Sequence, residues 1–357
     1  MAKFFPLLIS DIYKDTDECS VITLEVPEQL KREFQYKQGQ HLTLRAMIGN
    51  QDVRRSYSLC SSPLERKWQV AVKKIDGGLF STYANETLKK GDTIEVMPPH
   101  GTFYKDCTPS QKKNYIAFAA GSGITPILSI IKTHLASEPE STFKLFYLNR
   151  NVKSILFKED IEALKNEYFN RFEIFYFLTK EHRDVPLMNG RFTSDKINTL
   201  TNKIFDPKSI DECFICGPES MIFLIRDELE TAGIAKEKIH YELFTAGNST
   251  EQQTHVKSVL DKKVEGTEVT IIDGGKEFHF TMSKQFDNIL DGALAAGADL
   301  PFACKGGVCS TCRCKVLEGE AEMKVNYALD ESELKRNFIL SCQAVPTTSR
   351  LVVDFDV

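Results

Sequence analysis

The sequence has little that would place the protein in a membrane or on a nucleic acid. Its 357 residues contain no apolar run long enough to span a bilayer, and 45 Lys and Arg stand against 50 Asp and Glu. The chain does not open with a charged region, an apolar core and a cleavage site. We therefore expect a cytoplasmic protein, although ten cysteines are present.

The residues that activate oxygen are also lacking. A di-iron carboxylate centre needs two Glu-x-x-His pairs and further glutamates, and the only such pair is Glu237 with His240. Cys213 and Cys216 form a C-x2-C pair inside a predicted strand, and no second pair completes a zinc site. We expect Cys213 to lie in a hydrophobic core. If oxygen is activated, a separate protein must activate it.

Four cysteines have the spacing of plant-type 2Fe–2S ligands. Cys304, Cys309 and Cys312 follow C-x4-C-x2-C, and Cys342 comes 30 positions later. The glycines at 306–307 would let the loop wrap around a cluster and direct N–H groups at sulfur. A zinc site or free thiols are the alternatives.

Cys314 also stands at a ligand spacing from Cys309. Alternation along a strand would place it on the same face as Cys312 but farther along, so it is left out of the predicted ligand set.

Residues 266–357 hold 14 acidic and 9 basic side chains and so account for the whole net charge of −5. An acidic docking face and ordinary solubility both explain that excess.

The chain divides into blocks of different periodicity. Residues 1–108 favour an antiparallel β-barrel, and 109–245 alternate strands and helices, which is typical of an α/β parallel sheet. Residues 246–265 are polar and small, and we interpret them as a flexible linker. Residues 266–357 favour an α+β domain. The predicted strands are 20–26, 41–47, 68–73, 115–120, 143–148, 172–178, 212–216, 268–272 and 277–281, and the predicted helices are 126–137, 158–167, 219–232 and 286–296.

A possible flavin site lies in the first block. The run Arg55-Ser-Tyr57-Ser58 could stack a phenol on a flat ring, offer a hydroxyl near its edge and neutralise phosphate. The glycines at 77–78 precede a predicted helix start, whose N–H groups can bind pyrophosphate. The alternative for the first run is a strand with a purely structural role. The alternative for the glycines is a turn followed by a helix that has Ser81 or Thr82 as its N-cap.

A possible dinucleotide site lies in the second block. Strand 115–120 runs into Gly121-Ser-Gly123-Ile-Thr125-Pro126 and then a helix, which brings backbone close to a pyrophosphate. Proline at the sixth position departs from the G-x-G-x-x-G pattern but suits the first helical turn. The run 216–218, Cys-Gly-Pro, ends a further strand of the sheet.

Together these motifs resemble the ferredoxin-NADP reductase superfamily, in which R-x-Y-S, G-x-G-x-T-P and C-G-P occur in this order. With the cysteine segment added, the chain is similar to the reductase components of bacterial multicomponent oxygenases. The resemblance implies a β-grasp ferredoxin fold for residues 266–357, bound FAD in preference to FMN, and a nicotinamide co-substrate.

The resemblance also implies roles for single residues. The implied catalytic residues are Tyr57 on the isoalloxazine, Ser58 near its N5, Cys216 near the nicotinamide and Glu242 at the edge of the flavin site. The implied flavin contacts are Arg55, Gly78, Phe80, Ser81 and Phe244. The implied nicotinamide contacts are Gly121, Gly123, Thr125, Arg150, Gly217 and Pro218.

The choice of nicotinamide depends on the end of the second sheet strand. That strand ends in a basic segment containing Arg150 and Lys153, where an NAD site would place an acid. A cation suits a 2′-phosphate, which favours NADPH over NADH. We therefore expect electrons to pass from NADPH through FAD and the cluster to an oxygenase. A ring-hydroxylating dioxygenase or desaturase as acceptor, or a redox sensor without turnover, are the alternatives.

Overall fold

The computed structural model describes residues 3–244 and 250–357, which form two compact units. One unit consists almost entirely of residues 5–244, and the other almost entirely of the residues after them. In the part of the chain that the structure describes, no helix combines the length and apolar character needed to cross a bilayer. The domain boundaries expected from sequence at residues 108 and 245 stay predictions.

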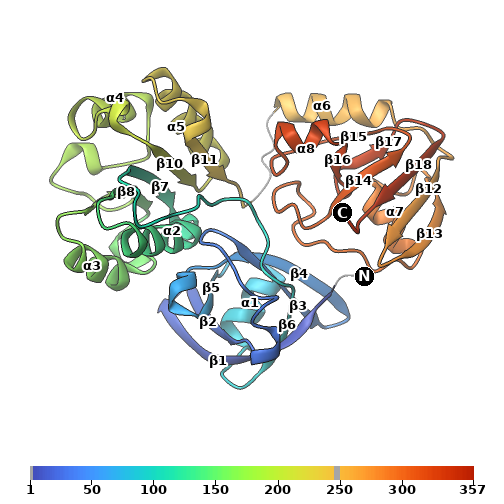
Figure 1. Cartoon of the computed structure of the whole chain (residues 1–357), viewed down its shortest axis with the longest axis horizontal. Coiled ribbons are helices and arrows are strands. Elements are labelled where there is room, and N and C mark those ends of the chain that lie inside the picture. Colours follow the sequence, from blue (N-terminus) through green and yellow to red (C-terminus); the bar gives the residue numbers. More distant parts are fainter. Residues whose placement is uncertain (1–2, 245–249) are drawn as a thin grey trace. The chain divides into compact units, whose positions relative to one another are not determined.

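The first unit begins with a six-stranded antiparallel sheet in the order β4-β3-β6-β1-β2-β5 (Figure 1). Its elements are β1 Phe5–Thr16, β2 Cys19–Glu25, β3 His41–Ile48, β4 Gln51–Ser58, β5 Trp68–Lys73, α1 Leu79–Glu86 and β6 Thr93–Val96. Leu59, directly after β4, forms an antiparallel bridge with Val70 of β5 and so joins the two ends of the sheet. The predicted β-barrel is confirmed.

A five-stranded parallel sheet in the order β11-β10-β7-β8-β9 follows in the same unit. Its elements are β7 Asn114–Ala120, α2 Ile124–Ser137, β8 Thr142–Asn149, α3 Lys158–Glu167, β9 Phe172–Leu178, α4 Ser194–Lys203, β10 Glu212–Cys216, α5 Glu219–Thr231 and β11 Ile239–Glu242. Helices α2 and α3 cover one face and α4 and α5 the other (Figure 1). The strand order reverses between β7 and β10, where ligands of such sheets bind.

The second unit contains a five-stranded mixed sheet in the order β13-β12-β18-β14-β16 and a small sheet of β15 and β17. Its elements are α6 Thr250–Asp261, β12 Glu268–Asp273, β13 Lys276–Thr281, α7 Ile289–Ala295, β14 Arg313–Glu318, β15 Ala321–Met323, α8 Glu331–Lys335, β16 Phe338–Leu340, β17 Ala344–Pro346 and β18 Arg350–Asp354. The hairpin β12–β13 and the parallel pairing of β12 with β18 form the predicted α+β fold.

Two predicted elements differ from the structure by more than one or two residues. The helix expected over residues 286–296 is shorter, because Asn288 caps it by accepting a hydrogen bond from the N–H of Asp291 at 2.9 Å. Helix α6 lies inside the predicted linker 246–265, where Val256 and the buried Val259 are three residues apart on one face. The helix was not predicted because the composition of this segment is mostly polar. Residues 245–249 of the predicted linker lie outside the described residues.

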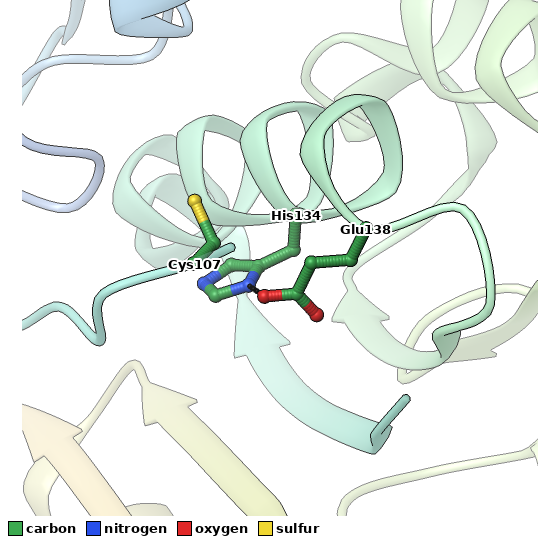
Figure 2. A group of neighbouring side chains, drawn as sticks. All are labelled: Cys107, His134 and Glu138. Atoms are coloured by element: carbon green, nitrogen blue, oxygen red, sulfur yellow. Dashed lines mark hydrogen bonds and ion pairs between the residues drawn. The ribbon is translucent and has the colours of Figure 1, made fainter. Parts of the chain in front are cut away.

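A buried polar network joins the segment after the barrel to the parallel sheet. Figure 2 shows Cys107, His134 and Glu138 as neighbours, with the last two at the end of α2. The Glu138 carboxylate lies 3.0 Å from His134 Nδ1 and accepts hydrogen bonds from Tyr115 Oη at 2.9 and 3.1 Å and from Ser141 Oγ at 2.7 Å. Its oxygens are therefore already engaged, and the group is a structural network although its ligand atoms lie within 4.8 Å of one another.

The same network fixes the ionisation of Glu138. Burial alone would raise the pKa of this carboxyl, but the hydrogen bonds from His134, Ser141 and Tyr115, together with the electrostatic attraction of His134, outweigh burial and lower it. A depressed pKa means that the ionised form stabilises the fold above the unfolded-state pKa, and that this contribution is lost as pH falls through the folded-state value.

We expect Glu138→Ala to destabilise the first unit by about 3–5 kcal/mol, because it leaves buried polar partners unsatisfied. Urea unfolding of the flavin-loaded protein, followed by the release of flavin fluorescence, measures the change. Glu140→Ala is the matched control, since the Glu140 side chain is 69% exposed. Equal midpoints for the two variants would contradict a stabilising role for the network.

Candidate active site and metal centre

Strand β4 presents the predicted flavin residues on alternate sides. Arg55 is exposed and donates from Nη1 to the carbonyl of Arg54 at 2.7 Å, whereas Ser58 is buried. The Tyr57 ring is half-buried, with its centroid 5.5 Å from that of Phe80. Ser58 Oγ donates to Glu242 Oε2 at 3.2 Å, so this strand meets the end of β11.

The start of α1 differs from the alternative in which Ser81 or Thr82 is the N-cap. Gly78 is the N-cap, and Ser81 Oγ accepts from the N–H of Ile75 at 3.1 Å and donates to the carbonyl of Gly78 at 3.2 Å. Neither Ser81 nor Thr82 caps the helix. The Phe80 side chain is 1% exposed in the barrel core, so only its backbone could reach a phosphate. The free N–H groups of this helix start remain suited to an anion.

Two glycine turns meet where the strand order of the parallel sheet reverses. Gly121 has a φ of +52°, and a Cβ on Gly123 would collide with the carbonyl oxygen of Cys216. A Cβ on Gly217 would lie 2.6 Å from Met221 Cε and 3.0 Å from Ala120 Cβ. Only glycine therefore lets the ends of β7 and β10 approach this closely.

The residues flanking these glycines hold the turns in shape. Thr125 is buried, and its Oγ1 donates to the carbonyl of Ser122 at 3.0 Å. Pro218 is the N-cap of α5 and, like Thr125, lies at a helix start beside the reversal point. The turn therefore presents backbone, not a bulky side chain, to a ligand.

Cys216 and Glu242 are paired residues on the adjacent parallel strands β10 and β11. Cys216 is fully buried, and burial, followed by the Glu242 charge, raises the pKa of its thiol well above the ordinary value. The thiol therefore stays neutral. Ser58, Cys216 and Glu242, three of the predicted catalytic residues, thus lie together at the junction of barrel and sheet.

His41, at the start of β3, was not predicted from sequence. Its Nδ1 lies 3.9 Å from Glu242 Oε1, and no residue in the described chain forms a hydrogen bond with its buried Nε2. Burial, and then the neighbouring His100, lower the pKa of His41 to about 3. A Cβ on Gly101, whose φ is +116°, would lie 3.0 Å from His41 Nδ1, so that glycine leaves room for the ring.

Two predicted residues lie at the edges of the site. Phe244 is 37% exposed and lies two residues after the end of β11. Arg150 is exposed after β8, and its carbonyl accepts from the N–H of Lys180 at 2.7 Å. Glu181 Oε2 accepts from the N–H of Val152 at 2.9 Å, so an acid borders the basic segment. Sequence reasoning missed Glu181 because it follows a different strand.

The cysteine loop has the backbone that a cluster requires. Lys305, Gly307 and Ser310 all have positive φ, at +52°, +75° and +52°. A Cβ on Gly307 would lie 3.1 Å from both Gln343 Cγ and the carbonyl oxygen of Val325. The N–H of Gly306 donates to Cys304 Sγ at 3.3 Å. The loop therefore turns tightly and directs backbone donors at sulfur.

The four predicted ligands form two pairs of thiols. A hydrogen bond from Cys309, aided by the Gly306 N–H, holds the pKa of Cys304 below its usual value, and one from Cys312 does the same for Cys342. Among the described residues, no three of these sulfurs lie within 4.8 Å of one another. A single tetrahedral zinc would need that proximity, whereas two irons bound by two thiols each would not.

Cys314 lies outside these pairs. It is fully buried in β14, opposite Ile339 of β16, within the core of the second unit. Burial raises the pKa of its thiol above the usual value. This placement supports leaving Cys314 out of the ligand set.

Comparisons with known proteins agree with this geometry. An oxidoreductase FAD-binding domain matches residues 9–104, an oxidoreductase NAD-binding domain matches 118–227, and a 2Fe-2S iron-sulfur cluster binding domain matches 271–347. Phthalate dioxygenase reductase has the same fold, with a TM-score of 0.57 and 24% identity, over 99% of this chain and 98% of that one.

Two curated relatives match over almost their full length. In Escherichia coli K12, one of the subunits of 1,2-phenylacetyl-CoA epoxidase is 41% identical, with 100% of this chain and 99% of the relative covered. The ferredoxin reductase component of 3-ketosteroid-9-alpha-monooxygenase from Rhodococcus rhodochrous is 32% identical, with 98% and 96% covered.

Fold, motifs and comparisons define an electron-transfer flavoprotein that uses NAD(P)H, FAD and a 2Fe–2S cluster and reduces an oxygenase partner. The chain belongs to the family of oxygenase reductase components that contains both relatives. The run 54–58, the pair Asn149 and Arg150, and the ending 241–244 resemble the reductase subunit of phenylacetyl-CoA epoxidase in particular. The full-length identity to the Escherichia coli protein confirms that resemblance.

We expect Gly123→Ala to slow flavin reduction by NADPH about 100-fold, because the added Cβ forces β7 and β10 apart at the turn. Anaerobic stopped-flow absorbance measures the rate, and flavin content verifies the fold. Ser122→Ala, in the same turn, should stay near the parent rate. Unchanged kinetics in Gly123→Ala would show that the dinucleotide binds elsewhere.

Proposed function

We propose that this chain is the reductase of a phenylacetyl-CoA epoxidase and passes electrons from NADPH to the oxygenase component. The supporting observation is the 41% identity to the Escherichia coli relative over the full length of both chains. The acidic second unit, with 14 acidic and 9 basic side chains over 266–357, suits a basic docking surface on the oxygenase.

The flavin would bind where barrel and sheet meet. Tyr57 would stack on its ring, and the phosphates would lie near Arg55 and the backbone of Gly78, Phe80 and Ser81, with Phe244 at the edge. A bound flavin supplies a carrier that accepts electrons as a pair and releases them singly.

The residues around the flavin ring would hold the two rings in position and would not themselves react. The Ser58 hydroxyl gives its hydrogen bond to Glu242 Oε2 and is thereby held in one orientation. The neutral Cys216 thiol would offer the nicotinamide an uncharged, compact surface. These roles rely on fixed geometry, which the two neighbouring strands supply.

The nicotinamide would bind at the two glycine turns, with Gly121, Gly123, Thr125, Gly217 and Pro218 close to it. Arg150 would receive the 2′-phosphate that distinguishes NADPH. Cys304 and Cys309 would hold one iron, and Cys312 and Cys342 the other, as the thiol pairing suggests.

Reconstitution with the partner tests the proposal. Purified protein should support NADPH-dependent epoxidation of phenylacetyl-CoA when mixed with the oxygenase component of that epoxidase. Cys309→Ser should keep flavin bleaching by NADPH but lose iron–sulfur absorbance and epoxidation, whereas Cys314→Ser should retain all three. Efficient turnover only with a ketosteroid monooxygenase, a ring-hydroxylating dioxygenase or a desaturase would reject the epoxidase assignment.

The nicotinamide preference gives a separate prediction. Arg150→Ala should raise KM for NADPH about tenfold and leave KM for NADH unchanged, since a lost charged hydrogen bond to phosphate costs about 1.5–3 kcal/mol. Steady-state cytochrome c reduction with each nucleotide measures this. Lys203→Ala, on the exposed end of α4, is the control. Equal effects on both nucleotides would contradict a role for Arg150 at the 2′-phosphate.

A further inference from the structure

Gln343 is a buried polar side chain between the last predicted cluster ligand and β17. It is 7% exposed, and its side-chain Nε2 donates to the carbonyl of Lys305 at 2.8 Å. The same nitrogen lies 3.6 Å from Cys342 Sγ, within hydrogen-bonding distance of sulfur. A primary amide has two N–H donors, so both acceptors can be satisfied at once.

The surrounding backbone holds this amide in place. The N–H of Gln343 donates to the carbonyl of Leu340, and its carbonyl accepts from the N–H of Lys324, each at 2.9 Å. Gly307 packs against Gln343 Cγ, where a Cβ would lie at 3.1 Å. Lys305, whose carbonyl Gln343 binds, is a non-glycine residue at a φ of +52°. Gln343 therefore connects the strained loop to the turn between β16 and β17 that contains Cys342.

We propose that Gln343 is a positioning residue that raises the reduction potential of the cluster through an N–H···S hydrogen bond to Cys342. A 2Fe–2S cluster held by these cysteines would carry more negative charge on its sulfur ligands in the reduced form than in the oxidised form. A fixed donor at one sulfur stabilises the reduced form more than the oxidised form. Gln343 itself neither gains nor loses an electron or a proton.

This inference rests on Cys342 being a ligand. The assignment of Cys342 as a ligand and the role of Gln343 can be tested separately. Cys342→Ser should lose the iron–sulfur absorbance, and an intact cluster in that variant would remove the basis of the inference. Changes at Gln343 should leave the cluster in place and alter its potential.

The experiment is a potentiometric titration of the full-length protein, with the reduced cluster followed by electron paramagnetic resonance. Gln343→Met keeps the length of the side chain and removes both donors, and Gln343→Glu adds a negative charge beside the sulfur. We expect the reduction equilibrium to weaken by up to about tenfold in Gln343→Met, which is about 59 mV for one electron, and further in Gln343→Glu. The flavin potential and the control Gln285→Met, at an exposed position, should not change.

A second measurement needs no variant. With ¹⁵N in glutamine side-chain amides, the reduced parent protein should show hyperfine coupling between ¹⁵N and the cluster. An unchanged potential in Gln343→Met with the cluster intact, or the absence of coupling in the labelled parent protein, would overturn the proposal.

Discussion

The close approach of β7 and β10 is the constraint on which the first unit depends. The strand order of the parallel sheet reverses there, and the Cys216 carbonyl occupies the space that a side chain on residue 123 would fill. This contact fixes the direction in which α2 and α5 leave the sheet. Their turns then expose backbone at one point, and the last residue of β10, Cys216, stands beside Glu242 of β11. The placement of the two glycine turns, and of Cys216 beside Glu242, thus follows from this one close contact.

The same constraint explains why barrel and sheet form one compact unit. Glu242 is placed by the sheet, yet it accepts its hydrogen bond from Ser58 of the barrel and lies near His41. A flavin site needs groups from both the barrel and the sheet, and the positions of these groups must be fixed to within a fraction of an ångström. The buried network around Glu138 and the shared hydrophobic core, which includes Cys60 and Phe214, supply that rigidity away from the site.

The strands predicted from sequence are all present in the described chain, but β1, β6, β11 and β14–β18 were not predicted, and the contacts between elements were predicted poorly. Strands β5, β9 and β10 and helix α3 have the predicted bounds, because apolar runs and turn residues are local signals. His41, Glu181 and Gln343 were missed because their partners lie on other elements, and no spacing rule encodes such contacts. Helix α6 was missed because its apolar face is narrow, with only Val256 and Val259 facing inward in the described part. The Gly78 cap was missed because Ser81 is the better capping residue by type but bonds within the preceding turn.

The cysteine loop shows the reverse case, in which spacing alone predicts the ligands but not their surroundings. C-x4-C-x2-C with a distant fourth cysteine is specific because two irons need two pairs of thiols, and the structure separates the thiols into such pairs. Spacing says nothing of potential, which depends on donors to sulfur. Those donors come from the Gly306 backbone and the Gln343 side chain. Since an electron carrier is useful only when its potential lies between donor and acceptor, the residues that set this potential are as much part of the site as the ligands themselves.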